Sequence, residues 1–143
     1  MKKNFLFFLS NGLITPYYVS QMALTGHISI VMCLTALVSG VSALYLSKFS
    51  NKIHIGIFIA TASLGILLMP YLIGQILYGV SVIITCLLIN IKTSKDKNTE
   101  LSFGKLTFYT EIAYAISLLV GGVISTTVSI PVAIGLMIAF VVV

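Results

Sequence analysis

Four polar side chains inside long apolar stretches are the candidates for binding a solute: Asn11, Thr15, Gln75 and Glu111. Amide, hydroxyl and carboxyl groups are costly inside a membrane, and those found there often mark substrate or ion pathways. We therefore predict these four as substrate-binding residues. The alternative for the neutral ones is hydrogen bonding between helices, which contributes about 0.6 kcal/mol per pair.

Glu111 lies near the start of the stretch FYTEIAYAISLLVGGVIS, where a carboxylate could carry a proton or bind a cation. It follows Lys105 by about 9 Å of helical rise, so its predicted depth is shallow. We therefore favour an acid near the inner membrane boundary, stabilised weakly by the positive end of its helix. A site for a proton or a cation is the alternative.

Enzymatic chemistry finds little support in the sequence. His27 and His54 are expected near opposite faces of the membrane, where they could not share a metal ion. Neither HExxH nor a Ser/His/Asp set is present. Cys33 and Cys86 lie in apolar segments and are interpreted as small buried hydrophobic residues. The expectation is a protein without enzymatic activity, metal or cofactor.

The composition explains why these polar residues stand out. Of the 143 residues, 59% are hydrophobic and 8% are charged, whereas a soluble domain is about 25% charged. The mean hydropathy is +1.15. These values are typical of an integral membrane protein with the lipid bilayer as its surroundings. The net charge of +5 comes from lysines in short clusters, without a basic helix face, so no nucleic-acid partner is expected.

Lysines divide the chain into three apolar blocks, residues 4–47, 53–91 and 106–143. A straight helix of such a block would measure about 60 Å, twice the hydrocarbon thickness of about 30 Å. Each block is therefore predicted to form a helical hairpin. The fold class is an all-α membrane protein, a single domain over residues 1–143. The six predicted spans are 4–24, 27–47, 53–69, 71–91, 105–125 and 128–143.

The lysines also predict the orientation. With six spans, all eight lysines fall on one side, which is the cytoplasmic side by the positive-inside rule. We predict a multi-pass protein of the cytoplasmic (inner) membrane with a cytoplasmic N-terminus. A signal peptide is the competing interpretation of the first apolar segment, but no small-residue cleavage site follows it promptly.

Small residues recur at helical spacing in the fifth predicted span, at Ala113, Ser117, Gly121 and Ser125. Such a ridge lets two membrane helices approach closely, so we predict that it packs against another helix. The second span repeats the pattern more weakly with Ala36, Gly40 and Ala43.

Three short stretches contain recognisable motifs: ALYLSKFSNK, residues 43–52, QILYGVS, residues 75–81, and AISLLVGG, residues 115–122. They resemble motifs of the major facilitator superfamily. The first is similar to the loop signature after the second helix of that family, with Lys48 and Lys52 at basic positions. QILYGVS, residues 75–81, resembles the fourth-helix pattern, with Gln75 in the place of an arginine. AISLLVGG, residues 115–122, resembles the fifth-helix antiporter signature in its two final glycines.

The resemblance implies one six-helix half of a secondary transporter, most similar to the N-terminal half. The expected activity is transport of a small solute, with a second six-helix half or a second copy of the chain as partner. The chain alone is not expected to be a working transporter. The alternative is a small membrane protein that transports nothing, such as an immunity factor or a subunit of a larger membrane complex.

Overall fold

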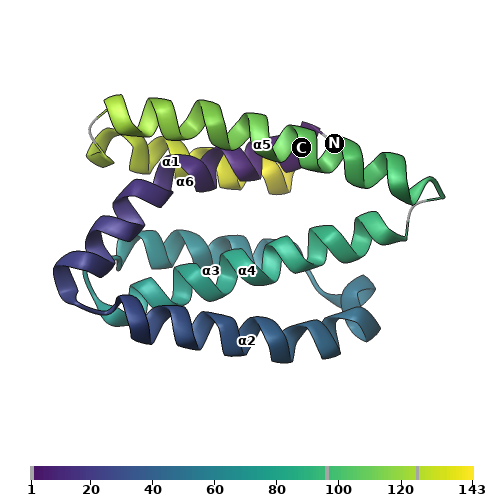
Figure 1. Ribbon diagram of the computed structural model, residues 1–143, viewed down its shortest axis with the longest axis horizontal. Helices are drawn as coiled ribbons and strands as arrows, with labels where there is room; N and C mark the ends of the chain where they lie inside the picture. Colours follow the sequence, from purple (N-terminus) through teal and green to yellow (C-terminus); the bar gives the residue numbers. More distant parts are fainter. Residues whose placement is uncertain (1, 96, 125) are drawn as a thin grey trace. The chain divides into compact units, whose positions relative to one another are not determined.

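The computed structural model describes residues 2–95, 97–124 and 126–143, and within them the fold is entirely helical (Figure 1). This confirms the predicted all-α class. The helices are α1 (Lys2–Thr25), α2 (Ile28–Phe49), α3 (Ile55–Leu67), α4 (Leu72–Ser94), α5 (Thr99–Val123) and α6 (Thr126–Val142), with a 3-10 turn η1 (Ser50–Lys52) after α2.

The largest difference from the predicted boundaries concerns α5, which begins at Thr99 rather than near residue 105. The lysines and acidic residues of this segment resemble a loop in composition. However, the first turn of α5 contains Glu100, and a carboxylate there is stabilised by the positive helix N-terminus. Since no proline follows Thr99 within the helix, nothing prevents the helix from extending over the charged residues.

The turn between α1 and α2 shows how local sequence ends a helix. The amide of His27 donates to the Met22 carbonyl over 3.1 Å, and that of Gly26 donates to the Ala23 carbonyl over 3.3 Å. These two bonds form a Schellman motif, in which the first residue after the helix adopts left-handed backbone angles. Gly26 accordingly has a φ of +71°. Glycine adopts this conformation without the steric cost of a side chain.

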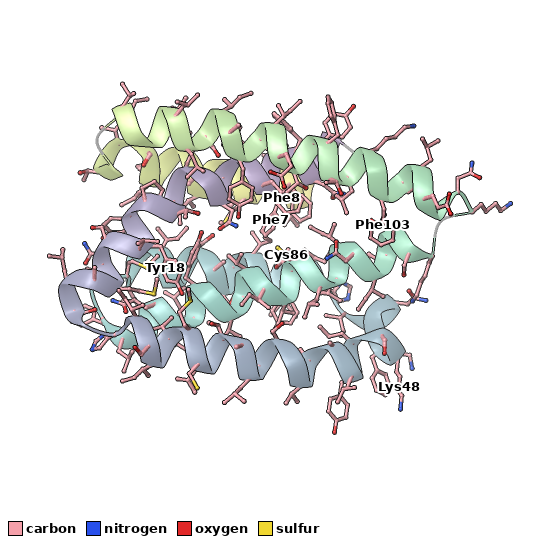
Figure 2. All side chains as sticks on the ribbon, viewed as in Figure 1. Phe7, Phe8, Tyr18, Lys48, Cys86 and Phe103 are labelled. Atoms are coloured by element: carbon pink, nitrogen blue, oxygen red, sulfur yellow. The ribbon has the colours of Figure 1, made fainter. Side chains whose placement is uncertain are left out.

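The chain folds into two compact units. Unit one contains α5, α6 and α1 up to Val19, and unit two comprises Ser20–Lys95 with α2, α3 and α4. In unit one, α1 packs through aromatic rings: Phe7 lies 5.5 Å from Phe140 of α6, and Phe8 lies 6.4 Å from Tyr114 of α5, measured between ring centroids. Figure 2 labels Phe7 and Phe8 on α1.

In unit two, α3 and α4 are held together by glycines. A Cβ atom added to Gly65 would lie 2.6 Å from the backbone nitrogen of Tyr78, so only glycine allows the two backbones to come this close. A second group of contacts joins α2 to α4, where Leu46, Ile84 and Leu88 form a buried apolar cluster. α4 is therefore the central helix of this unit.

Within the described residues, three helices are long and apolar enough to cross a membrane: Ile28–Phe49, Leu72–Ser94 and Glu100–Val123. Two shorter apolar helices, Ile55–Leu67 and Thr127–Val142, accompany them. Large apolar side chains such as Leu37, Leu44 and Tyr45 are more than half exposed on α2. Soluble monomers rarely expose an apolar surface of this extent, and this exposure is consistent with a membrane protein.

Candidate functional site

A hydrogen bond between Asn11 of α1 and Tyr114 of α5 is the centre of the candidate site. The Asn11 side-chain nitrogen donates to the Tyr114 hydroxyl over 2.5 Å. Asn11 is buried and Tyr114 is half-buried. The two residues are 103 positions apart in the chain, so the bond exists only because the two helices pack against each other.

The close packing depends on Gly12 and Ser117. A Cβ atom added to Gly12 would overlap the Ser117 hydroxyl and lie 2.9 Å from the Ser117 Cβ. One turn further along α5, a Cβ on Gly121 would lie 3.3 Å from the carbonyl oxygen of Leu13. Both glycines therefore face the partner helix, and the side chains of Asn11 and Tyr114 meet beside this contact.

The small residues Ala113, Ser117, Gly121 and Ser125 are called the α5 ridge, and Ala36, Gly40 and Ala43 are called the α2 ridge. The predicted packing role of the α5 ridge is confirmed for its described members, since Ala113 and Ser117 are fully buried and Gly121 is buried too. Ser125 lies outside the described residues. The α2 ridge behaves differently: all three of its residues are exposed, and a Cβ on Gly40 would meet nothing within 4 Å. The α2 ridge therefore does not pack against another helix of the described residues, because α2 contacts α4 through its other face.

Thr15 lies one turn after Asn11, and its hydroxyl serves the helix backbone. It donates to the carbonyl oxygen of Asn11 over 2.7 Å. The next residue, Pro16, has no amide hydrogen and so removes one bond from this part of α1. The Thr15 hydrogen is therefore used within α1, and its oxygen could offer a solute only an acceptor.

Glu111 lies on an exposed side of α5. By the helical period of 100° per residue, it is rotated by about 160° from Ala113, the start of the buried ridge. The structure therefore does not bring Glu111 together with Asn11 and Thr15. Its carboxylate faces away from the interior of unit one.

Gln75 belongs to unit two, where it is fully buried. Its side-chain nitrogen donates to the hydroxyl of Thr25 and to the carbonyl oxygen of Met69, each over 3.1 Å. The side-chain oxygen of Gln75 has no hydrogen-bond partner. This amide therefore joins the end of α1 to the turn between α3 and α4, and one of its two polar atoms remains unused.

Tyr114 and Thr25 were not identified from the sequence. Tyr114 directly follows Ala113, so its position beside the α5 ridge was a usable signal for a polar tip at a helix contact. No comparable signal marks Thr25, because its importance comes from Gln75, 50 positions away.

No cluster of three or more His, Cys, Asp or Glu residues that could hold a metal ion exists among the described residues. The two cysteines are free thiols, but Cys33 is exposed and Cys86 is half-buried. The interpretation of Cys33 as a buried hydrophobic residue was therefore wrong. It lies on the side of α2 turned away from α4, as the α2 ridge does.

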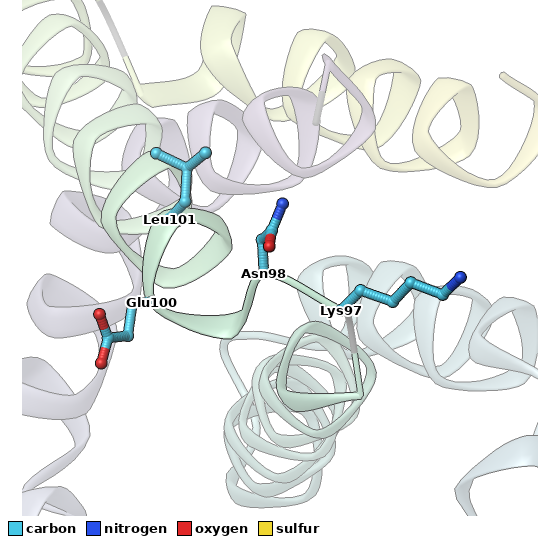
Figure 3. A pocket seen from close by; sticks show the side chains of 4 residues that line it. All are labelled: Lys97, Asn98, Glu100 and Leu101. Carbon is cyan, nitrogen blue, oxygen red and sulfur yellow. The ribbon is translucent and has the colours of Figure 1, made fainter.

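An open hollow of about 510 Å³ lies at the start of α5, lined by Lys97, Asn98, Glu100 and Leu101. Figure 3 shows the side chains of Lys97 and Glu100 pointing in opposite directions rather than converging. Because its charged groups do not face a common point, this hollow does not form a binding site for a small solute. The Asn11–Tyr114 pair remains the better candidate.

Comparison with known proteins identifies no relative: no protein family, no curated sequence and no solved structure matches the chain.

Proposed function

We propose that this protein is a half-transporter of the cytoplasmic (inner) membrane, similar in plan to one six-helix half of a major facilitator transporter. It moves a small solute as a secondary transporter. All six helices span the membrane as three hairpins within a single domain, and the N-terminus faces the cytoplasm. The three long apolar helices support this proposal, as do the lysines gathered on one side of the predicted topology.

The short helix α3 fits this topology with local adaptation of the bilayer. Its 13 residues span about 20 Å, less than the hydrocarbon core of about 30 Å. A short span can be accommodated by thinning of the bilayer around it. The apolar residues before and after α3, Ile53 and Leu68, lengthen its hydrophobic stretch.

The observation that carries the proposal is the Asn11–Tyr114 hydrogen bond. Asn11 lies about 14 Å along α1 by the helical rise, close to the middle of a membrane about 30 Å thick. Secondary transporters bind their substrates near this depth, on polar groups between packed helices. The hydroxyl and amide together carry both donors and acceptors at a fixed position.

The transport cycle requires a second bundle, since alternating access moves one bundle against another around a shared site. We propose a second copy of the chain in this role, with a separate six-helix half as the other arrangement. The exposed α2 ridge supports contact between copies, because small residues on a lipid-facing helix permit close approach of a partner helix.

Transport can be tested by placing the purified chain in liposomes and measuring uptake from a panel of radiolabelled amino acids, sugars and quaternary amines. We expect uptake of at least one solute by a cross-linked dimer and none by a monomer. Tyr114→Phe should reduce this uptake, whereas Tyr45→Phe, at a side chain 62% exposed, should not. Uptake by a proven monomer would refute the half-transporter, and a dimer inactive towards the whole panel would favour the non-transporting alternative.

The orientation can be tested separately with single cysteines in a cysteine-free background. Three exposed residues lie at the turns expected outside the cell: Leu24 near the α1–α2 turn, Tyr71 near the α3–α4 turn and Thr127 near the α5–α6 turn. Cysteines there should react with an impermeant thiol reagent added to intact cells. Cysteines at Asn51 and Asn98 should react only after the cells are opened. Labelling of position 51 from outside would contradict the six-span topology.

A further inference from the structure

The orientation of the Gln75 side chain is fixed by its neighbours. The backbone carbonyl of Met69 can only accept a hydrogen bond, so the amide nitrogen of Gln75 must be the atom that faces it. A flipped amide would place two oxygen atoms against each other. The side-chain oxygen must therefore point elsewhere, and it is this buried oxygen that has no partner.

The position of this oxygen is set by close helix packing. A Cβ on Gly74 would overlap the carbonyl group of Leu68 and lie 2.8 Å from the Leu68 Cβ. This contact holds the turn after α3 directly against the first turn of α4, beside Gln75. The two helices are therefore close together beside Gln75, whose side chain is fully buried.

A buried carbonyl-type oxygen without a donor is costly, and the cost is removed when a ligand supplies positive charge or a hydrogen. Other oxygens lie near the same amide, since its nitrogen donates to the Thr25 hydroxyl and the Met69 carbonyl. The Thr25 hydroxyl in turn donates to the Gln21 carbonyl over 2.8 Å and more weakly to the Met22 carbonyl over 3.4 Å. Met22 and Thr25 are in the last turn of α1, and Met69 follows the end of α3. Helix C-termini carry partial negative charge.

The distribution of charged residues in unit two limits the chemical class of the ligand further. Residues 20–95 contain neither aspartate nor glutamate, so every oxygen that unit two itself supplies near Gln75 is uncharged. No lysine or arginine lies between residues 53 and 91, so no protein cation within that block competes for these oxygens. Neutral oxygen ligands suit a monovalent cation, as in potassium channel filters, whereas calcium sites usually include carboxylates.

We infer that the side-chain oxygen of Gln75 is a ligand of a small monovalent cation, bound with neutral oxygens at the ends of α1 and α3. The imidazole nitrogen Nδ1 of His27, in the turn before α2, is also buried without a partner. As the coupling ion of a secondary transporter, this cation rests on the function proposed above. Its binding to the protein does not depend on transport and is tested without it.

The test is thermal unfolding of the full chain in detergent, followed by circular dichroism, in chloride salts of sodium, potassium, ammonium or choline at equal ionic strength. One of the three small cations should raise the Tm above its value in choline. A concentration ten times the Kd should raise it by about 4 °C, with saturation. The unfolding readout separates this inference from the proposed function, because a protein that binds the ion but moves no solute refutes only transport.

Two variants at Gln75 identify the ligand. Gln75→Met keeps the length of the side chain but has no acceptor oxygen, and it should lose the cation-dependent rise in Tm. Gln75→Glu keeps the oxygen and adds charge, but it places a second carboxylate oxygen against the Met69 carbonyl, so without the cation this variant should be less stable than the parent. Its rise in Tm should appear at lower cation concentration, which serves if the methionine variant does not fold. A parent protein with the same Tm in all four salts overturns the inference. So does a glutamate variant whose midpoint for the cation is unchanged.

Discussion

Replacing Gly12 by alanine tests whether the α1–α5 contact holds unit one together. The added methyl group would overlap the Ser117 hydroxyl and lie 2.9 Å from the Ser117 Cβ. Overpacking of this kind costs about 1–3 kcal/mol, while alanine gains up to about 1 kcal/mol over glycine in helix propensity. The difference is about 0–2 kcal/mol. Because the methyl group would overlap the Ser117 hydroxyl, we expect the upper end, a net loss of about 2 kcal/mol or a Tm lowered by about 6 °C for a chain of this size.

The control is Gly104→Ala on α5, because a Cβ there would meet nothing within 4 Å. This variant should be as stable as the parent or more so, since only the propensity changes. The double variant Gly12→Ala with Ser117→Gly removes the Ser117 side chain that the new methyl group would overlap. It should therefore recover much of the lost Tm. Thermal unfolding by circular dichroism in detergent measures all three. Equal stability of the Gly12 and Gly104 variants would refute the close contact.

A larger substitution at Gly121, the glycine of the α5 ridge, should lower the stability more than Gly12→Ala does. Gly121→Leu would force a branched side chain against the backbone of Leu13, where even a Cβ would lie 3.3 Å from the carbonyl oxygen. Leu119→Ala, at a side chain 71% exposed, should change the Tm little in detergent. If the two variants unfold at the same temperature, the α5 ridge does not pack against α1.

Three further predictions concern the α1–α2 turn, the outward carboxylate and the partner. Gly26→Ala should destabilise the chain by about 1–2 kcal/mol because of the positive φ, and Gly26→Asn should cost less in the same unfolding measurement. Glu111→Gln should leave folding and any pH-driven uptake unchanged, and loss of that uptake alone would show a proton site. In a dimer that pairs the exposed α2 faces, oxidation should join Cys33 to Cys33 of the second copy. Gly40→Leu on that face should prevent this cross-link, whereas Leu37→Ala should not.

The helices were largely predictable because their causes are local. An apolar block of about 40 residues exceeds the bilayer thickness and must turn, and Gly26 and Pro70 occur where the turns are found. The start of α5 was missed for an equally local reason. The charged residues before Lys105 were interpreted as a loop, although a helix can extend into water beyond the membrane boundary.

The candidate site was predictable only in part. Asn11 stood out because an amide is costly in an apolar helix, but its partner Tyr114 depends on which helices pack together. The outward direction of Glu111 could have been obtained from the sequence. The α5 ridge was already identified as the packing face, and Glu111 is rotated by about 160° from its first residue.

Glycine contacts determine the polar contacts in each of the two units. In unit one, Gly12 brings α1 against α5, and only then can the amide of Asn11 reach the Tyr114 hydroxyl. In unit two, Gly74 holds the Met69 turn against α4, which fixes the amide of Gln75. A bond between two side chains in the membrane contributes about 0.6 kcal/mol, too little to overcome a backbone clash costing about 1–3 kcal/mol. Substitutions at the glycines should therefore disrupt the polar pairs, whereas Tyr114→Phe should leave the helix packing intact.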